Sequence, residues 1–116
     1  MYDYKVIRVI KVVDGDTCDL SLDLGFYLST GMRFRLLGCD APEHKEAGWQ
    51  ECKDLLATFL QQQATTTIYA KTVKSDHFGR WLADLYVIHD DGTEDHYADR
   101  LNAIMAENGW TSPSVR

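Results

Sequence analysis

The sequence has few cysteines, no long run of apolar residues and fewer basic than acidic side chains. Its three cysteines, Cys18, Cys39 and Cys52, are odd in number and form no Cys-x-x-Cys pair, so neither a disulfide framework nor a zinc ribbon is indicated. We expect three reduced thiols. No segment approaches the roughly 20 apolar residues of a membrane helix, and no secretory signal is recognisable at the N-terminus. The sequence therefore predicts a cytoplasmic protein without a membrane partner, or a secreted one if a signal has been removed.

The shortage of basic residues counts against a role in binding nucleic acid. The chain carries 12 Lys and Arg against 18 Asp and Glu, a net charge of -6, whereas nonspecific nucleic-acid binders usually have a basic excess. Several of the acids crowd together between residues 90 and 95, and others lie in motifs where a divalent cation would offset them. The field at one site can be positive while the total charge is negative.

The composition is that of an ordinary globular protein. Of the 116 residues, 45% are hydrophobic and 26% are charged, which is typical of a folded chain rather than a disordered one. A chain of this length can bury one hydrophobic core without disulfides. Because it has no internal repeat and no linker, we expect residues 1–116 to form one domain, and we expect a monomer without an obligate protein partner.

The first half of the chain predicts three strands. Lys5 to Val13 is rich in valine and isoleucine, which favours a strand. Thr17 to Leu24 alternates apolar and polar residues, which places its leucines on one face. Asp14-Gly15-Asp16 is then the turn between these strands. Gly25 to Gly31 is predicted to be the next connection, and Met32 to Leu37 the third strand.

The second half predicts two helices and further strands. Apolar residues at helical spacing indicate one long helix from about Ala47 to Gln63. The remaining elements, in chain order, are strands at Thr65 to Val73 and Trp81 to Ile88, a hairpin turn at Asp91-Gly92 into Thr93 to His96, and a short helix from Ala98 to Asn108 capped by Gly109. This order favours a mainly β, α+β fold, a five-stranded OB-fold barrel with one long helix after the third strand and a short C-terminal helix.

Three short stretches carry carboxylates and arginines in an order that suits phosphate chemistry. They are Asp14-Gly15-Asp16-Thr17, Arg35 through Glu43, and Asp76-His77-Phe78-Gly79-Arg80. Carboxylate oxygens are the ligands that Ca²⁺ prefers, and the planar guanidinium of arginine binds phosphate oxygens in pairs. Together these stretches predict a site where a hard cation and an anionic substrate meet.

These stretches, with Phe34-Arg35-Leu36-Leu37 and the segment from Asn102 to Trp110, resemble the signature blocks of the staphylococcal nuclease (thermonuclease) family. The resemblance covers nearly the whole chain, and its several blocks stand in the family's order at compatible spacings. It implies a Ca²⁺-dependent nuclease on an OB-fold barrel. Such an enzyme hydrolyses phosphodiester bonds of DNA and RNA on the 5′ side and leaves 3′-phosphate ends.

The resemblance also implies a role for each site residue. By this similarity Ca²⁺ is bound by the carboxylates of Asp16 and Asp40 and by the carbonyl of Ala41. Arg35 holds the scissile phosphate, and Glu43 aligns or deprotonates the attacking water.

The block that ends at Arg80 supplies the other side of the implied site. Arg80 is the second arginine on the scissile phosphate, and His77 and Phe78 are expected to contact the substrate. His77 stands where the family often has lysine, which predicts a weaker hold on the substrate.

Each motif also has a simpler interpretation. Asp14-Gly15-Asp16 taken alone is more typical of a hairpin turn, Arg35 in a strand is usually solvated or ion-paired, and Glu43 before a helix would suit the helix dipole. The joint occurrence of these groups favours a site. The alternative function is a noncatalytic OB-fold module that binds nucleic acid or a protein. The retained acids and arginines favour the enzyme.

Overall fold

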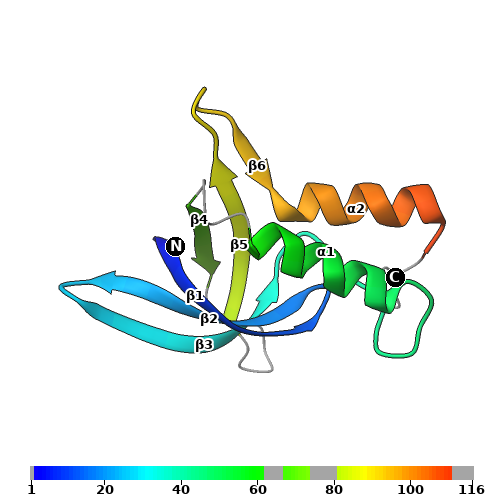
Figure 1. Ribbon diagram of the computed structural model, residues 1–116, viewed down its shortest axis with the longest axis horizontal. Helices are drawn as coiled ribbons and strands as arrows, with labels where there is room; N and C mark the ends of the chain where they lie inside the picture. The colour runs from blue at the N-terminus through cyan, green and yellow to red at the C-terminus, as the bar shows by residue number, and fades with distance from the viewer. Residues whose placement is uncertain (1, 62–66, 74–80, 111–116) are drawn as a thin grey trace.

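The computed structural model describes residues 2–61, 67–73 and 81–110. Three strands, a helix, three strands and a second helix follow one another along the chain (Figure 1). The elements are β1 (Tyr2–Asp14), β2 (Thr17–Gly25), β3 (Leu28–Leu36), α1 (Trp49–Gln61), β4 (Ile68–Val73), β5 (Trp81–Ile88), β6 (Glu94–His96) and α2 (Tyr97–Asn108). Neither of these helices is long and apolar enough to cross a membrane.

Five of the described strands close into a barrel. The sheet order is β3-β2-β1-β4-β5-β6, and β3 also pairs with β5. That closing pair is parallel and sets Phe34 opposite Trp81 and Leu36 opposite Ala83, whereas the other neighbours are antiparallel. The order closes the mixed barrel of an OB fold and leaves β6 as an additional strand on β5. The predicted α+β fold with a five-stranded OB-fold barrel is confirmed.

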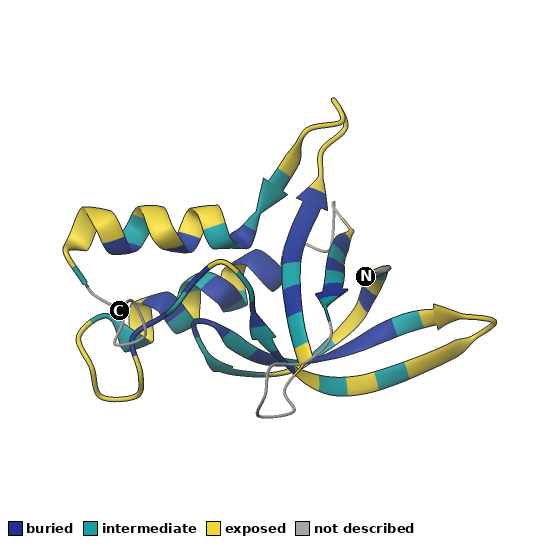
Figure 2. Cartoon of the chain, turned by 180° about the vertical axis from the view of Figure 1, so that it is seen from behind, coloured by how far each residue is buried: buried dark blue, intermediate teal, exposed yellow. Residues whose placement is uncertain are grey.

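Alternating side chains fill the barrel, and α1 packs across one of its ends. In β2 the alternation predicted from the sequence places Cys18, Leu20 and Leu22 in the interior. The apolar stripe of α1 contributes four buried side chains, Cys52, Leu56, Phe59 and Leu60. Buried positions concentrate in the strands of the barrel and on the inner sides of the helices (Figure 2). Because apolar side chains fill the interior of the barrel, polar groups of a functional site would lie at the strand ends and in the loops.

The predicted connection between Gly25 and Gly31 is wrong, because β3 begins at Leu28. Gly25 pairs with Leu28, so the turn is only Phe26-Tyr27. Both residues have left-handed backbone angles, with φ of 53° and 63°. Such a turn is usually made by asparagine and glycine, so two aromatic residues gave no turn signal and the strand was predicted too short.

The helices begin and end close to their predicted bounds. α1 begins at Trp49 rather than at Ala47, because Gly48 has a φ of 87°, which a right-handed helix does not admit. α2 runs to Asn108, and Gly109 ends it in the left-handed conformation expected of a C-cap. The predicted end of the long helix beyond Gln61 and the predicted start of the next strand lie outside the described residues.

Candidate active site

Three segments meet at one end of the β2 and β3 strands: the turn at residues 15–16, the end of β3, and the loop that follows β3. The amide of Leu36 donates to the carbonyl of Asp16 at 2.8 Å. The strand register sets Thr17, the next residue after Asp16, opposite Arg35. The backbone therefore holds Asp16 and Arg35 side by side, although 19 positions separate them in the sequence.

Gly15 lets the turn approach α1 and the loop after β3. A Cβ atom at this position would lie 2.7 Å from the Cβ of Cys52 and 2.8 Å from the Cβ of Ala41. The hydroxyl of Tyr97, at the start of α2, donates to the carbonyl of Gly15 at 2.6 Å. Both helices thus fix the position of the turn that carries Asp16.

The guanidinium of Arg35 lies between two carboxylates. Its Nη1 is 3.3 Å from Oδ2 of Asp16, and its Nη2 donates to Oδ1 of Asp40. Nη1 also donates to the carbonyl oxygens of Leu36 at 2.9 Å and Cys39 at 2.8 Å. The backbone and the two acids together hold the guanidinium in one orientation.

Asp16 is buried, with 8% of its surface exposed, and its carboxylate is surrounded by donors. Oδ2 accepts a hydrogen bond from the amide of Ala41 at 2.7 Å, and Oδ1 accepts one from the hydroxyl of Thr17 at 3.1 Å. Within the described residues, every buried side-chain nitrogen or oxygen has a hydrogen-bond partner. Because a buried carboxylate is costly unless it is paired, these donors are what allow it to lie there.

Asp16 and Asp40 could supply two carboxylate ligands to a hard cation if it displaced Arg35 from them. Two carboxylates around one guanidinium leave one negative charge in excess, and Ca²⁺ prefers carboxylate oxygens among its roughly six to eight ligands. No cluster of three or more His, Cys, Asp or Glu side chains in residues 2–61, 67–73 and 81–110 is arranged to hold a metal. Water, backbone oxygens or substrate would therefore supply most of the ligands. Ala41 presents its amide to Asp16, and the ligand role of its carbonyl stays a prediction.

The cysteines near the site are free, buried thiols. Burial, followed by the nearby Asp16, raises the pKa of Cys39 to about 12. Burial also raises the pKa of Cys18 to about 12 and that of Cys52 to about 11. A thiol with so high a pKa is protonated at neutral pH and is therefore a poor nucleophile. The chemistry of this site therefore belongs to oxygen and guanidinium groups.

Of the other predicted site residues, only Glu43 lies within the described residues. Glu43 is exposed, and its amide donates to Oε1 of Glu46 at 2.6 Å. The Glu43 carboxylate makes no hydrogen bond or ion pair with another described residue. Arg80, His77 and Phe78 lie outside the described residues, so their predicted roles stay predictions. The structure thus brings together Asp16, Arg35, Asp40 and Ala41.

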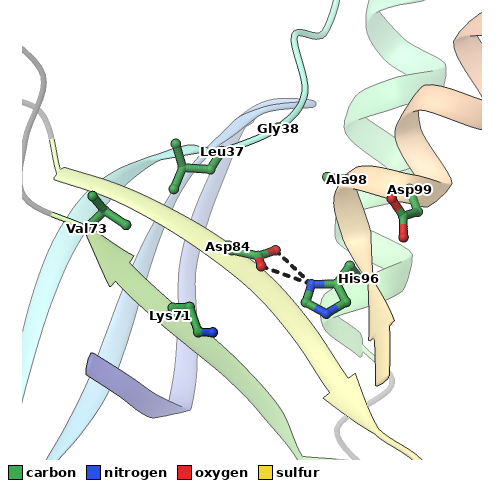
Figure 3. A pocket seen from close by; sticks show the side chains of 8 residues that line it. All are labelled: Leu37, Gly38, Lys71, Val73, Asp84, His96, Ala98 and Asp99. Atoms are coloured by element: carbon green, nitrogen blue, oxygen red, sulfur yellow. Dashed lines mark hydrogen bonds and ion pairs between the residues drawn. The ribbon is translucent and has the colours of Figure 1, made fainter. Parts of the chain in front are cut away.

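A second polar cluster, on β5 and β6, was not anticipated from the sequence. Nδ1 of His96 is 2.9 Å from Oδ2 of Asp84, and Nε2 is 2.9 Å from Oε1 of Glu94. The hydrogen bond with Asp84, followed by that with Glu94, raises the pKa of His96 above its ordinary value of 6.5. Asp84 and His96 border a pocket of about 320 Å³ together with Lys71 and other side chains (Figure 3). The available signal was the turn at Asp91-Gly92, which sets the register of β5 and β6.

The chain is similar to two curated proteins. It is 26% identical over 102 residues to a protein named Protein ParB from Escherichia coli, across 88% of this chain and 53% of that protein. It is 30% identical over 79 residues to a protein named as an uncharacterized endonuclease from Escherichia coli O157:H7, across 68% of this chain and 46% of that protein. The chain thus spans about half the length of these relatives. No protein-family model matches it.

Proposed function

We propose that this protein is a Ca²⁺-dependent nuclease that hydrolyses phosphodiester bonds of DNA and RNA. The observation that carries the proposal is the guanidinium of Arg35 held between the carboxylates of Asp16 and Asp40. A relative that is named as an endonuclease, and the order of the sequence motifs, support the same activity.

Asp16 and Asp40, with the carbonyl of Ala41, would hold the cation at this site. Bound there, Ca²⁺ would supply a Lewis acid that polarises a phosphoryl oxygen. Asp16 is fixed by hydrogen bonds from two neighbouring groups, so its position does not depend on the ion. A rigid carboxylate of this kind suits a site that must place a phosphate within a small tolerance.

Arg35 would bind the scissile phosphate. Its Nη1 is anchored on the carbonyls of Leu36 and Cys39, and these two bonds do not involve the acids. When a cation binds the carboxylate of Asp40, the guanidinium would keep this anchorage, and a phosphate oxygen would replace Asp40 as the acceptor for Nη2. A preorganised donor that meets charge developing in the transition state contributes about 100- to 1,000-fold in rate. Arg80 would act as the second such donor.

Glu43 would accept the proton of the attacking water. Its exposed carboxylate has no partner among the described residues, so it is free to bind a water molecule. The oxygen of that water would form a bond to phosphorus while the bond from phosphorus to the 5′ oxygen breaks. The departing 5′ oxygen would take a proton from solvent water, so the products would be a 3′-phosphate end and a 5′-hydroxyl end.

The test is cleavage of denatured DNA and of RNA by the purified protein with Ca²⁺, compared with the same reaction in chelator. We expect Ca²⁺-dependent cleavage and a loss of about 100- to 1,000-fold in Arg35→Ala. The matched control is Arg33→Ala, because Arg33 lies two positions earlier on β3 and pairs with Asp19 at the surface. We expect Arg33→Ala to retain most of the activity.

Two outcomes would contradict this mechanism. Cleavage that persists in chelator would show that the reaction needs no cation. An Arg35→Ala variant as active as Arg33→Ala would show that Arg35 does not bind the scissile phosphate. A wild-type protein that binds oligonucleotides but never cuts them would identify a noncatalytic OB-fold module instead. Mg²⁺ should substitute poorly, because it demands a near-ideal octahedron with shorter bonds.

A further inference from the structure

The end of the β2–β3 hairpin, residues 24–32, projects from the barrel and is apolar; we call it the arm. It extends away from both helices (Figure 1), and its tip is exposed in Figure 2. The exposed fractions are 94% for Phe26, 107% for Tyr27 and 61% for Leu28. Single exposed apolar residues are common, but a contiguous group of large ones marks an interaction surface.

The backbone at the tip is held in a conformation that its residues do not favour. Gly25, Phe26 and Tyr27 have φ values of 85°, 53° and 63°. Bulky residues rarely adopt this left-handed region, whereas the Asn-Gly pair typical of such a turn adopts it readily. The turn itself therefore gives no reason for Phe26 and Tyr27. Their exposed side chains are the feature that needs an explanation.

The lack of charge on the arm argues against two kinds of partner. Residues 24–32 contain no charged side chain. The nearest cation along β3 is Arg33, whose Nε already donates to Asp19 at 2.7 Å. A nucleic-acid backbone or an anionic membrane would require basic residues on the contacting surface. An uncharged, aromatic tip is instead suited to an apolar pocket on a protein.

The arm itself forms part of such a pocket, through Leu24, Thr30 and Met32. It has a volume of about 140 Å³ and is lined by Tyr4, Leu24, Met32, Phe34 and Trp81, with further side chains of β2, β3 and β4. It is at the end of the barrel where β1 and β5 begin. Pockets for small-molecule ligands usually measure about 300 to 1,000 Å³. This pocket is smaller and could accept one inserted side chain. We call it the mouth pocket.

We propose that two copies of this chain form a dimer in which the aromatic tip of each arm enters the mouth pocket of the other. The pocket residue Leu24 is two positions from Phe26, less than about 10 Å at a rise of about 3.4 Å per residue. Because tip and pocket are so close on one ribbon, two antiparallel arms can fill both pockets at once. That arrangement has the two-fold symmetry of most homodimers.

The buried area predicts a weak dimer. An aromatic side chain buries about 150 to 250 Å², so the four side chains of the two tips bury about 600 to 1,000 Å², and the interface lies near the lower limit for a specific one. Association would then be visible at micromolar to millimolar protein and absent at high dilution. The sequence led us to expect a monomer, and the arm is the reason to revise that expectation.

The test is sedimentation velocity over a dilution series. We expect the weight-average mass of the wild type to rise from 13.2 kDa towards twice that value as concentration increases. The double variant Phe26→Asn with Tyr27→Gly should weaken association at least about tenfold, because it removes the aromatic anchors. Its melting temperature, measured at a dilution where both proteins are monomers, should not fall, because Asn-Gly suits the turn. A tip that served only the fold would give the opposite result.

A second variant tests the pocket separately. Leu24→Lys places a charge on the pocket wall at a position that is 43% exposed, so the variant should fold and yet associate at least about tenfold more weakly. Mixing it with the Asn-Gly variant restores one tip with one pocket, and we expect a mixed dimer of intermediate affinity. A wild type that remains monomeric at about 1 mM, or an Asn-Gly variant that dimerises as tightly as wild type, would overturn the proposal. So would tip-dependent binding of the monomer to vesicles or oligonucleotides.

Discussion

The two ends of the β2–β3 ribbon are built in opposite ways. At one end, the buried Asp16 and the guanidinium of Arg35 are held by hydrogen bonds from within the chain. At the other end, Phe26 and Tyr27 are exposed and hold an unfavourable backbone conformation. The first end is stabilised by contacts that the chain itself supplies. The second exposes groups whose burial requires another molecule, which is why we assign chemistry to one end and association to the other.

Two ion pairs made by arginines of β3 differ in how deeply they are buried. Arg33 and Asp19 form a well-aligned pair with an Nε to Oδ1 distance of 2.7 Å, and Arg33 is 56% exposed. The hydrogen bond from Arg33 lowers the pKa of Asp19. The pair of Arg35 and Asp16 is longer, at 3.3 Å, but both side chains are less than one-fifth exposed. Water screens an exposed ion pair, so the pair contributes little to the stability of the fold. Removing one partner of a buried pair leaves an unpaired buried charge, which is strongly destabilising.

The largest expected effect is that of removing one charge at the buried end. Asp16→Asn keeps the size of the side chain and an acceptor for the amide of Ala41, but it loses a cation ligand. We expect nuclease activity to fall by roughly 100-fold or more, because a metal that polarises a phosphoryl group contributes several kcal/mol. Ca²⁺ affinity, measured by calorimetry, should fall in parallel.

The matched control for this change is Asp19→Asn, on the strand β2 that follows the turn. Its partner Arg33 is at the surface, so we expect activity to change by less than about fivefold. Equal losses of activity in Asp16→Asn and Asp19→Asn would contradict the proposal that the buried ion pair serves catalysis and the surface pair does not. An Asp16→Asn variant with unaltered Ca²⁺ affinity would show that the ion binds elsewhere.

Much of the fold could be predicted from the sequence because local signals agreed with the final packing. The alternation from Thr17 to Leu24 gave the inner face of β2, and Gly109 gave the end of α2. The Phe26-Tyr27 turn could not be predicted, since neither residue favours a left-handed conformation. Our proposal explains those residues by a contact with a second molecule, which the local sequence does not encode.

The candidate site could be predicted only in part. The order of the motifs predicted that Asp16, Arg35 and Asp40 would meet, and the structure brings these residues together. It does not bring the Glu43 carboxylate into a contact with them. The pairing of His96 with Asp84 depends on the register of β5 and β6, for which the turn at Asp91-Gly92 was the available signal.

The second prediction tests how tightly the buried end is packed. In Gly15→Ala the added methyl group would lie 2.7 Å from the Cβ of Cys52 and 2.8 Å from that of Ala41. Overpacking of this kind costs about 1 to 3 kcal/mol, which denaturant unfolding would measure. The control is Gly31→Ala, where the Cβ would approach only the end of the exposed Ile10 side chain, at 3.0 Å. We expect a change within about 0.5 kcal/mol there, and equal costs in the two variants would contradict the contrast.

The prediction with the smallest expected effect concerns the ion pairs of His96, which lie away from both ends of the β2–β3 ribbon. It asks whether a paired charge at this position stabilises the fold. The folded state raises the pKa of His96 above 6.5, mainly through its hydrogen bond with Asp84. The folded protein therefore binds this proton more tightly than the unfolded chain does, so the stabilisation is complete below pH 6.5 and is lost as pH rises through the folded pKa. The difference in unfolding free energy between wild type and His96→Gln should therefore shrink as the pH rises, by less than about 1 kcal/mol.

Asp84→Asn should remove more of this pH dependence than Glu94→Gln, because Glu94 is 54% exposed and Asp84 only 26%. A pH dependence that is unchanged in Asp84→Asn, or of opposite sign in wild type, would refute the assignment of the effect to this pair.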